Sequence, residues 1–218
     1  MNLTHENLSP HERTILGAFI GIYARRWMED PQRKLHDIHE KVIKPALGMQ
    51  NGDRVLEVGV GIGDHLKSYR GFNYWGVDTD PQALMLAQEN ADLHEIDDRR
   101  ILQTSPRNLP FKDGEFERVF SLCTLHEVED ITQTLTEIDR VLSKNGRVAI
   151  AERITAYGES PEAQARLREE PLLLPKWFGE RSYQTETKSF KASYWGESLE
   201  GKPSFDFYLF IAQKTNKT

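Results

Sequence analysis

The chain has 218 residues, of which 38% are hydrophobic and 28% charged, as expected of one domain that buries a core without disulfides or metals. A net charge of -6 and a pI near 5.7 provide no overall attraction for nucleic acid or anionic membranes. The single cysteine, Cys123, excludes an internal disulfide framework and a cysteine-built zinc site, and its apolar surroundings predict a small core residue.

The first fifty residues predict a helical cover that precedes the first strand. Ser9, Pro10 and Glu12 form a helix start, and the apolar face that follows includes Tyr23 and Trp27. A second helix restarts at Pro31 and ends before Gly48. The start of the chain lacks a secretory-signal pattern, and "ILGAFIGIYA" is too short to span a bilayer. We therefore expect a cytoplasmic protein without a membrane span.

A histidine pair in the second helix raises the question of a metal. In "HDIHE", His36 and His39 lie one turn apart, beside Glu40. The sequence offers no evident third ligand, and a solvated helix face explains the pattern. We predict no metal site.

Short apolar runs alternate with segments of helical period from residue 51 to about 155. The strand candidates are "RVLEV", "NYWGV", "RRILQ", "ERVFSLC" and "GRVAIAERI", and the helical segments between them include "DHLKSY", "PQALMLAQENADL" and "ITQTLTEIDRVL". This alternation predicts an α/β fold with a mostly parallel, Rossmann-like sheet that is covered by helices on both faces.

The last third of the chain has a different pattern. Residues 156–186 read as an insertion or lid, and 187–214 as an antiparallel hairpin built from "ETKSFKASYWG" and "FDFYLFIAQK". Together with the N-terminal cover (1–50) and the core (51–155), these segments make one domain, 1–218.

The stretch "RVLEVGVGIGDHLKSY" carries glycines 59, 61 and 63 at a strand-to-helix turn. A dinucleotide fingerprint needs its third glycine where Asp64 stands, and a phosphate-binding loop needs a lysine followed by serine or threonine. The turn therefore fits a nucleoside without phosphates, because bare glycines let the backbone approach a ligand closely. Glu57 offers a carboxylate to a cationic group.

Asp78 stands nineteen residues after Gly59, at the end of the second strand. An acid at this point of a nucleotide-binding sheet accepts hydrogen bonds from the ribose hydroxyls. The alternative for Asp78 is a solvated turn residue, whereas Asp80 and Pro81 are explained as the cap and first residue of the next helix.

Five segments resemble the class I S-adenosylmethionine-dependent methyltransferases, in particular their small-molecule group. They are "LEVGVGIG", "GVDTDPQALMLAQ", "NLPFKDGEFERVFS", "LHEVED" and "EIDRVLSKNGRVAIAE", in the order and spacing of the family between Val55 and Arg153. The resemblance implies S-adenosylmethionine as cofactor and S-adenosylhomocysteine as product.

The resemblance also implies roles for individual residues. Glu57 and the backbone from Val58 to Gly61 would hold the methionine end, Asp78 the ribose, and Thr79 the adenine, while Ser121 and Leu122 would lie nearest the sulfonium. The implied cofactor residues are Glu57, Val58, Gly59, Gly61, Asp78, Thr79, Ser105, Pro106, Ser121 and Leu122.

The chain departs from the family on the adenine side. Ser105 stands where the family usually has an aspartate, and Pro106 has no N–H to donate. Adenine recognition is then either rearranged, through Arg107 or Asn108, or weaker than in the family. This departure keeps open the alternative of a protein that binds the cofactor or its product without chemistry.

His126 is the candidate base or acceptor-orienting group, because histidine titrates near neutral pH and follows the fourth strand. We expect His126 and Glu127 at the mouth of the site, with Glu127 the weaker candidate. The alternative is that His126 merely caps the turn.

The segment "PLLLPKWFG" after the fifth strand predicts an apolar lid, with Trp177 and Phe178 facing the acceptor and Tyr23 and Trp27 closing the other side. Ordinary packing against the sheet is the alternative for this segment.

The sequence thus predicts methyl transfer to an O, N or C nucleophile of a small molecule by in-line displacement. The absence of "NPPY"-like and "DPPY"-like runs disfavours amino methylation of DNA bases. The acidic chain disfavours RNA, which stays an alternative, and the glycine spacing disfavours a nicotinamide oxidoreductase. The acceptor and the oligomeric state are left open.

Overall fold

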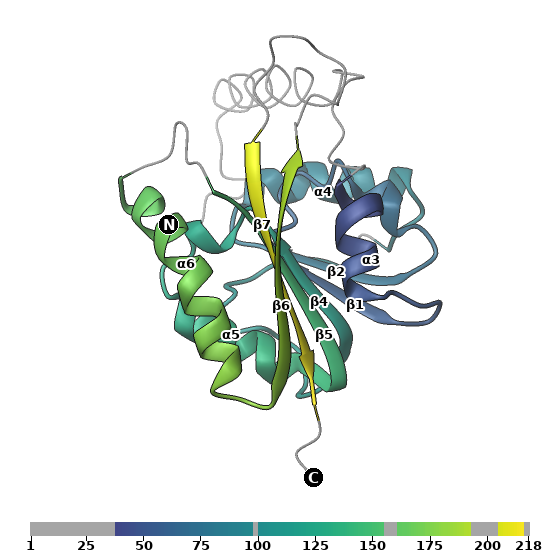
Figure 1. Cartoon of the computed structure of the whole chain (residues 1–218). Coiled ribbons are helices and arrows are strands. Elements are labelled where there is room, and N and C mark those ends of the chain that lie inside the picture. Colours follow the sequence, from purple (N-terminus) through teal and green to yellow (C-terminus); the bar gives the residue numbers. More distant parts are fainter. Residues whose placement is uncertain (1–37, 98–99, 155–160, 193–204, 216–218) are drawn as a thin grey trace.

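The computed structural model describes residues 38–97, 100–154, 161–192 and 205–215 (Figure 1). A single sheet organises this part of the chain, with strand order β3-β2-β1-β4-β5-β7-β6. Its strands are β1 (Arg54–Val58), β2 (Asn73–Asp78), β3 (Ile101–Gln103), β4 (Phe116–Leu122), β5 (Leu142–Arg153), β6 (Tyr183–Ala192) and β7 (Phe205–Lys214).

The first five strands pair in parallel, and β7 runs antiparallel to both β5 and β6. This confirms the predicted mostly parallel sheet with an antiparallel C-terminal pair. The chain leaves β1 towards β2 on one side and later returns to β4 on the other side. Ligands of open α/β sheets bind at such a switch point, beyond the carboxyl ends of the strands.

Helices cover both faces of the sheet. In chain order they are η2 (His39–Ile43), α3 (Lys44–Leu47), η3 (Leu66–Tyr69), α4 (Pro81–Leu93), η5 (Leu125–Glu127), α5 (Ile131–Val141) and α6 (Pro161–Gly179). The aspartates Asp80 and Asp130 cap α4 and α5, each accepting a hydrogen bond from a backbone N–H of the first turn. Within the described residues, none of these helices combines the length and the apolar character needed to cross a membrane.

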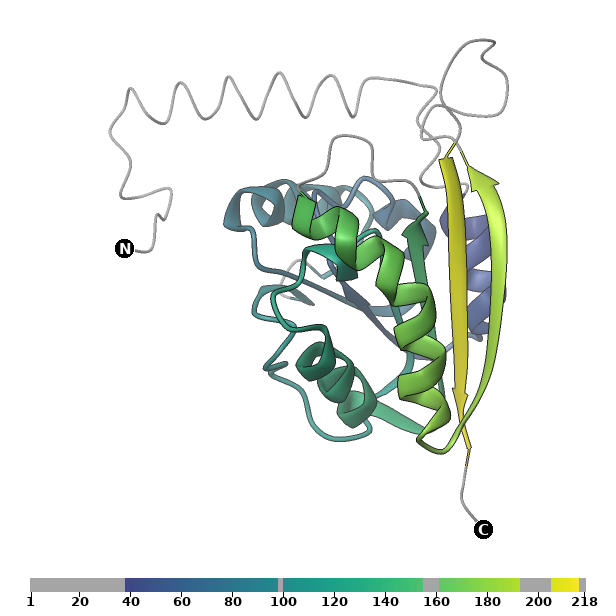
Figure 2. The same ribbon diagram turned by 60° about the vertical axis from the view of Figure 1, so that its left-hand side comes forward.

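The two faces have separate hydrophobic cores. One contains Leu135 and Ile138 of α5 with Leu174 and Phe178 of α6, and the other contains residues of α3, η3 and α4. Successive residues of β7 alternate between them, as expected of a strand covered on both sides. In Figure 2, α6 lies on one side of β7 and α3 on the other.

The predicted lid is part of a helix instead. Pro171 and Pro175 lie inside α6, which continues through both of them. Trp177 is 6% and Phe178 0% exposed, and both belong to the core that α6 forms with the sheet. The structure thus corresponds to the alternative, packing against the sheet, because burying these large rings outweighs the helix-breaking tendency of the prolines.

An ion pair fastens the loop between β3 and β4 to α5. Arg140 forms hydrogen bonds with both carboxylate oxygens of Glu137 and with the carbonyl oxygens of Leu109 and Phe111, and Glu137 accepts from the Leu109 N–H at 2.7 Å. The hydrogen bonds from Arg140 hold the pKa of Glu137 below its ordinary value. This contact joins the "NLPF" segment to the "EIDRVL" segment of α5.

Candidate functional site

A pocket of about 680 Å³ lies where β1, β2 and β4 end. Nine of the ten predicted cofactor residues line it, and the tenth, Ser121, is fully buried and does not. The nine are Glu57, Val58, Gly59, Gly61, Asp78, Thr79, Ser105, Pro106 and Leu122. Segments from four separate parts of the sequence therefore meet in one cavity.

The glycine turn forms the centre of the pocket. Gly59 has a φ of 91°, and its N–H donates to the Val77 carbonyl at 2.8 Å, so that the turn is tied to β2. A Cβ at Gly59 would lie 2.0 Å from Thr124 Oγ1, whereas a Cβ at Gly61 would have no heavy atom within 4 Å. Gly59 is thus needed for packing, and Gly61 leaves open space for a ligand.

Asp78 connects the glycine turn after β1 with the turn that precedes α4, beside the pocket. Its Oδ2 accepts from the Gly61 N–H at 2.8 Å, and its Oδ1 accepts from the Asp80 N–H at 3.0 Å. Each carboxylate oxygen has a second lone pair, so a ribose hydroxyl can still bind. Asp78 is therefore an ordered part of the pocket wall, which goes beyond a solvated turn residue.

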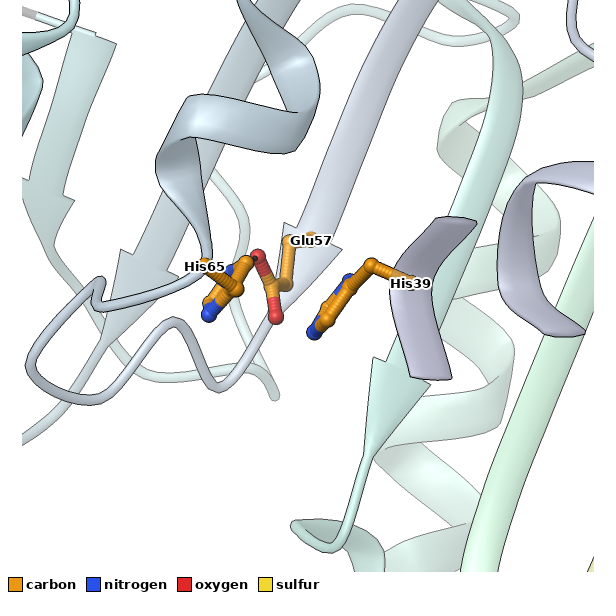
Figure 3. A group of neighbouring side chains, drawn as sticks. All are labelled: His39, Glu57 and His65. Carbon is orange, nitrogen blue, oxygen red and sulfur yellow. Dashed lines mark hydrogen bonds and ion pairs between the residues drawn. The ribbon is translucent and has the colours of Figure 1, made fainter. Parts of the chain in front are cut away.

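Three buried polar side chains gather at the end of β1, as Figure 3 shows. Glu57, His65 and His39 are 1%, 5% and 1% exposed, and all three line the pocket. His65 Nε2 lies 2.6 Å from Glu57 Oε2, which also accepts from the Tyr74 hydroxyl. The solvated face predicted for His39 is wrong, because His39 packs onto His65 and contacts the Tyr69 hydroxyl.

The environment of His65 stabilises its charged form. Burial alone would lower its pKa, but the charge of Glu57 and hydrogen bonds with Asp64 and Glu57 outweigh it and raise the pKa to about 9. The same site raises the pKa of the Tyr74 and Tyr69 hydroxyls, chiefly through burial and then through the nearby Glu57 charge. At neutral pH, Glu57 and His65 therefore form a buried ion pair.

The adenine side of the pocket is formed by the loop that carries the departure from the family. Ser105 Oγ accepts from the Arg107 N–H at 3.3 Å, and the Arg107 guanidinium pairs with Glu129 at 2.6 Å. Ser105, Arg107 and Glu129 all line the pocket. The ion pair therefore joins the loop after β3 to the loop before α5 at the pocket wall. Arg107 lines the pocket, and Asn108 does not.

His126, the predicted base, does not line the pocket. His126 is 1% exposed, is absent from the pocket lining, and bonds through Nδ1 to Glu152 Oε2 at 2.7 Å. Glu152 Oε1 accepts from the Thr124 and Leu125 N–H groups at 2.8 and 2.7 Å. The geometry is that of a residue that holds a turn, because His126 lies behind the pocket wall instead of at its mouth. Glu127 does line the pocket.

Some lining residues were not identified from the sequence. Cys123, predicted as a core residue, is half-buried with a φ of 54° and lines the pocket beside Thr124. His65 carries the signal of a histidine two residues after the glycine turn, whereas His39 depends on contacts between distant segments. Tyr23 and Trp27 lie outside the described residues.

Comparisons with known proteins agree with this geometry. The family model described as "Methyltransferase domain" matches residues 56–150. YrhH of Bacillus subtilis strain 168, a candidate methyltransferase by name, is 32% identical over 121 residues, which are 54% of this chain and 67% of YrhH. The erythromycin 3''-O-methyltransferase of Saccharopolyspora erythraea is 29% identical over 150 residues, 66% of this chain but 49% of that protein.

A solved structure shows the same fold. The phosphoethanolamine N-methyltransferase 2 of Haemonchus contortus, in complex with phosphomonomethylethanolamine and S-adenosylhomocysteine, superposes with a TM-score of 0.67 at 17% identity. The match covers 97% of this chain and 61% of that one.

The chain belongs to the class I S-adenosylmethionine-dependent methyltransferases. Its cofactor is S-adenosylmethionine, and the described residues fit that molecule. The open space at Gly61 fits a nucleoside that approaches the glycine turn, and the ordered Asp78 fits its ribose. The buried Glu57 carboxylate fits a cationic group. Ser105 and Pro106, the departure from the family, line the same pocket as Arg107.

Proposed function

We propose that this methyltransferase acts on a small molecule without a phosphate group and methylates an O, N or C nucleophile. The observation that carries the proposal is the convergence of the glycine turn, Asp78 and the end of β4 in one pocket. The cofactor, when bound, supplies a methyl group that is already activated on its sulfonium. The protein then needs to align the nucleophile and exclude water.

The charge of the pocket supports an acceptor of this class. Six acidic side chains line it against the cations Arg107 and His65, and they are Glu57, Asp64, Asp78, Asp80, Glu127 and Glu129. An acidic cavity attracts a cationic cofactor and repels an anionic acceptor. A neutral or amine-bearing acceptor is therefore favoured over a phosphorylated one.

Glu127 is the residue that we assign to orienting the acceptor and, where the nucleophile must lose a proton, to receiving it. Its side chain lines the pocket and is 66% exposed, whereas His126 lies behind the wall. Leu122, Cys123 and Thr124 supply the neighbouring wall, which keeps that side of the cavity partly apolar.

The test is a binding and turnover experiment on the full chain. Calorimetry with S-adenosylmethionine and S-adenosylhomocysteine comes first, with Asp78→Ala as the variant expected to lose at least about tenfold in affinity. An acceptor screen then uses matched pairs such as ethanolamine and phosphoethanolamine, with methylated product as the readout. Turnover confined to phosphorylated acceptors would contradict the proposal, and binding without turnover of any acceptor would favour the non-catalytic alternative.

A further inference from the structure

The cluster of Glu57, His65 and His39 at the end of β1 has no assigned role beyond that of Glu57. We propose that His65 is a positioning residue that holds the carboxylates of Glu57 and Asp64 for the ammonium group at the methionyl end of the cofactor. The proposal rests on the proposed function only in taking an S-adenosyl ligand as the occupant of the pocket.

The hydrogen bonds of Glu57 leave half of its carboxylate for a ligand. Both described donors, His65 Nε2 and the Tyr74 hydroxyl, go to Oε2. No described hydrogen bond reaches Oε1, although the residue is 1% exposed and lines the pocket. A carboxylate oxygen that faces a cavity can bind a donor there, and a cationic N–H donor is the strongest available.

The position of His65 fixes both carboxylates at once. Nε2 bonds to Glu57, and Nδ1 lies 3.6 Å from Asp64 Oδ1. The ring stacks on His39 with centroids 4.0 Å apart and planes 4° from parallel, and His39 is held in turn by the Tyr69 hydroxyl at 2.8 Å. The imidazole therefore cannot turn without breaking contacts on three sides.

The charges of the cluster suit one ammonium group. An imidazolium between two carboxylates leaves one net negative charge facing the pocket, which an ammonium group neutralises. Without His65, no cation would lie between the two carboxylates, and they would repel each other. His65 thus holds both carboxylates in place.

A metal ion is the competing occupant of this cluster. His39, Glu57 and His65 offer ligand atoms within 4.8 Å of one another. However, imidazole lone pairs lie in the ring plane, so two rings stacked face to face do not direct them at a common point. Glu57 Oε2 also already accepts two hydrogen bonds. The stacked geometry favours an organic cation, which binds without reorienting the rings.

The experiment measures three ligands on the full chain by calorimetry. S-adenosylhomocysteine carries the ammonium and carboxylate groups, its decarboxylated analogue keeps only the ammonium, and 5'-methylthioadenosine has neither. His65→Leu removes the bridge, His65→Gln restores a neutral donor towards Glu57, and His94→Leu is the matched control outside the pocket lining.

We expect His65→Leu to weaken the two ammonium-bearing ligands at least about tenfold and 5'-methylthioadenosine less than about twofold. His65→Gln should recover part of the loss, and it carries the test alone if His65→Leu does not fold. His94→Leu should change none of the three.

Four results would overturn the proposal. Equal loss for all three ligands, or no loss for any, would leave His65 without a role at the methionyl end. Loss for S-adenosylhomocysteine but not for its decarboxylated analogue would assign the cluster to the carboxylate. Tight binding of Zn²⁺ that competes with S-adenosylhomocysteine and is lost in His65→Gln would identify a metal site. A wild-type chain that binds the ligands but methylates nothing contradicts only the proposed function.

Discussion

Two buried histidine–glutamate pairs lie at neighbouring strand ends, and they have nearly the same local geometry. His65 and Glu57 are 2.6 Å apart at the end of β1, and His126 and Glu152 are 2.7 Å apart at the end of β4 and β5. All four side chains are buried. Only the first pair lines the pocket.

The difference between the pairs is the number of protein donors on the carboxylate. Glu152 uses both oxygens, for His126 and for two backbone N–H groups that follow β4. Glu57 uses one oxygen, and its described donors are side chains. A carboxylate filled by the backbone fixes a turn, whereas one with an oxygen left over can hold a ligand.

The largest expected effect on stability comes from removing Glu152, which pairs with His126. Glu152→Ala leaves His126 and the Thr124 and Leu125 N–H groups without their acceptor. Denaturant unfolding should show a loss of about 3–5 kcal/mol, as for a buried pair that loses one partner. Glu117→Ala, which breaks the exposed pair with Arg54, should cost less than about 1 kcal/mol. Similar losses for both variants would contradict the distinction.

The pair of His65 and Glu57 should make the free energy of unfolding depend on pH. The pKa of His65 rises from 6.5 to about 9 on folding, so its contribution is complete below pH 6.5 and is lost as the pH rises through about 9. The size is on the order of 3 kcal/mol. The groups facing the ring are Glu57, Asp64, His39 and Tyr69.

The measurement is the unfolding free energy of wild type minus that of His65→Gln, from about pH 6 to pH 10 in denaturant. The difference should be largest at the acid end of this range and shrink towards the alkaline end. A difference that does not change with pH would show that His65 contributes through packing alone.

A third prediction tests the link between the two regions, since Thr124 is held by Glu152 and packs against Gly59. Gly59→Ala should cost about 2–3 kcal/mol, combining positive φ with overpacking, and Gly61→Ala about 1 kcal/mol from φ alone. Thermal unfolding of both variants checks this. The double variant Gly59→Ala with Thr124→Gly should regain the stability that Gly59→Ala loses through overpacking against Thr124. If it regains none, the whole loss comes from the strained backbone at position 59.

The smallest expected effect concerns His126 and the cofactor. Because His126 lies behind the pocket wall, His126→Gln should change the dissociation constant of S-adenosylhomocysteine by less than about threefold. Calorimetry at one pH suffices, with His65→Gln as the variant that does respond. A larger change for His126 would make the two pairs functionally alike.

Local patterns predicted much of the fold and of the cofactor pocket. The strand and helix periods, the glycine turn and Asp78 are read from neighbouring residues, and the sheet order then brings their strand ends together. The local pattern assigns His39 to a solvated face, since nothing near it in the sequence reveals Tyr69 and His65. It places His126 at the mouth of the site, because the partner Glu152 lies on another strand.

The prolines of α6 illustrate the same limit. Pro171 and Pro175 read locally as brackets around a loop, yet the helix continues through both. The buried contacts of Leu174, Trp177 and Phe178 with the sheet stabilise it, and these contacts depend on strands far along the chain. The rule that proline ends a helix therefore fails where packing against segments distant in the sequence stabilises the helix.

The position of β7 also has a consequence for how the protein is made. Among the described strands, β6 lies at the edge of the sheet and pairs with β7 alone, and β7 also pairs with β5. A ribosome completes β6 before β7, so the nascent β6 has no strand to join until the later segment emerges. Strands β1 to β5 can assemble during synthesis, but β6 and β7, two of the seven described strands, complete the sheet only after Lys214 has left the exit tunnel.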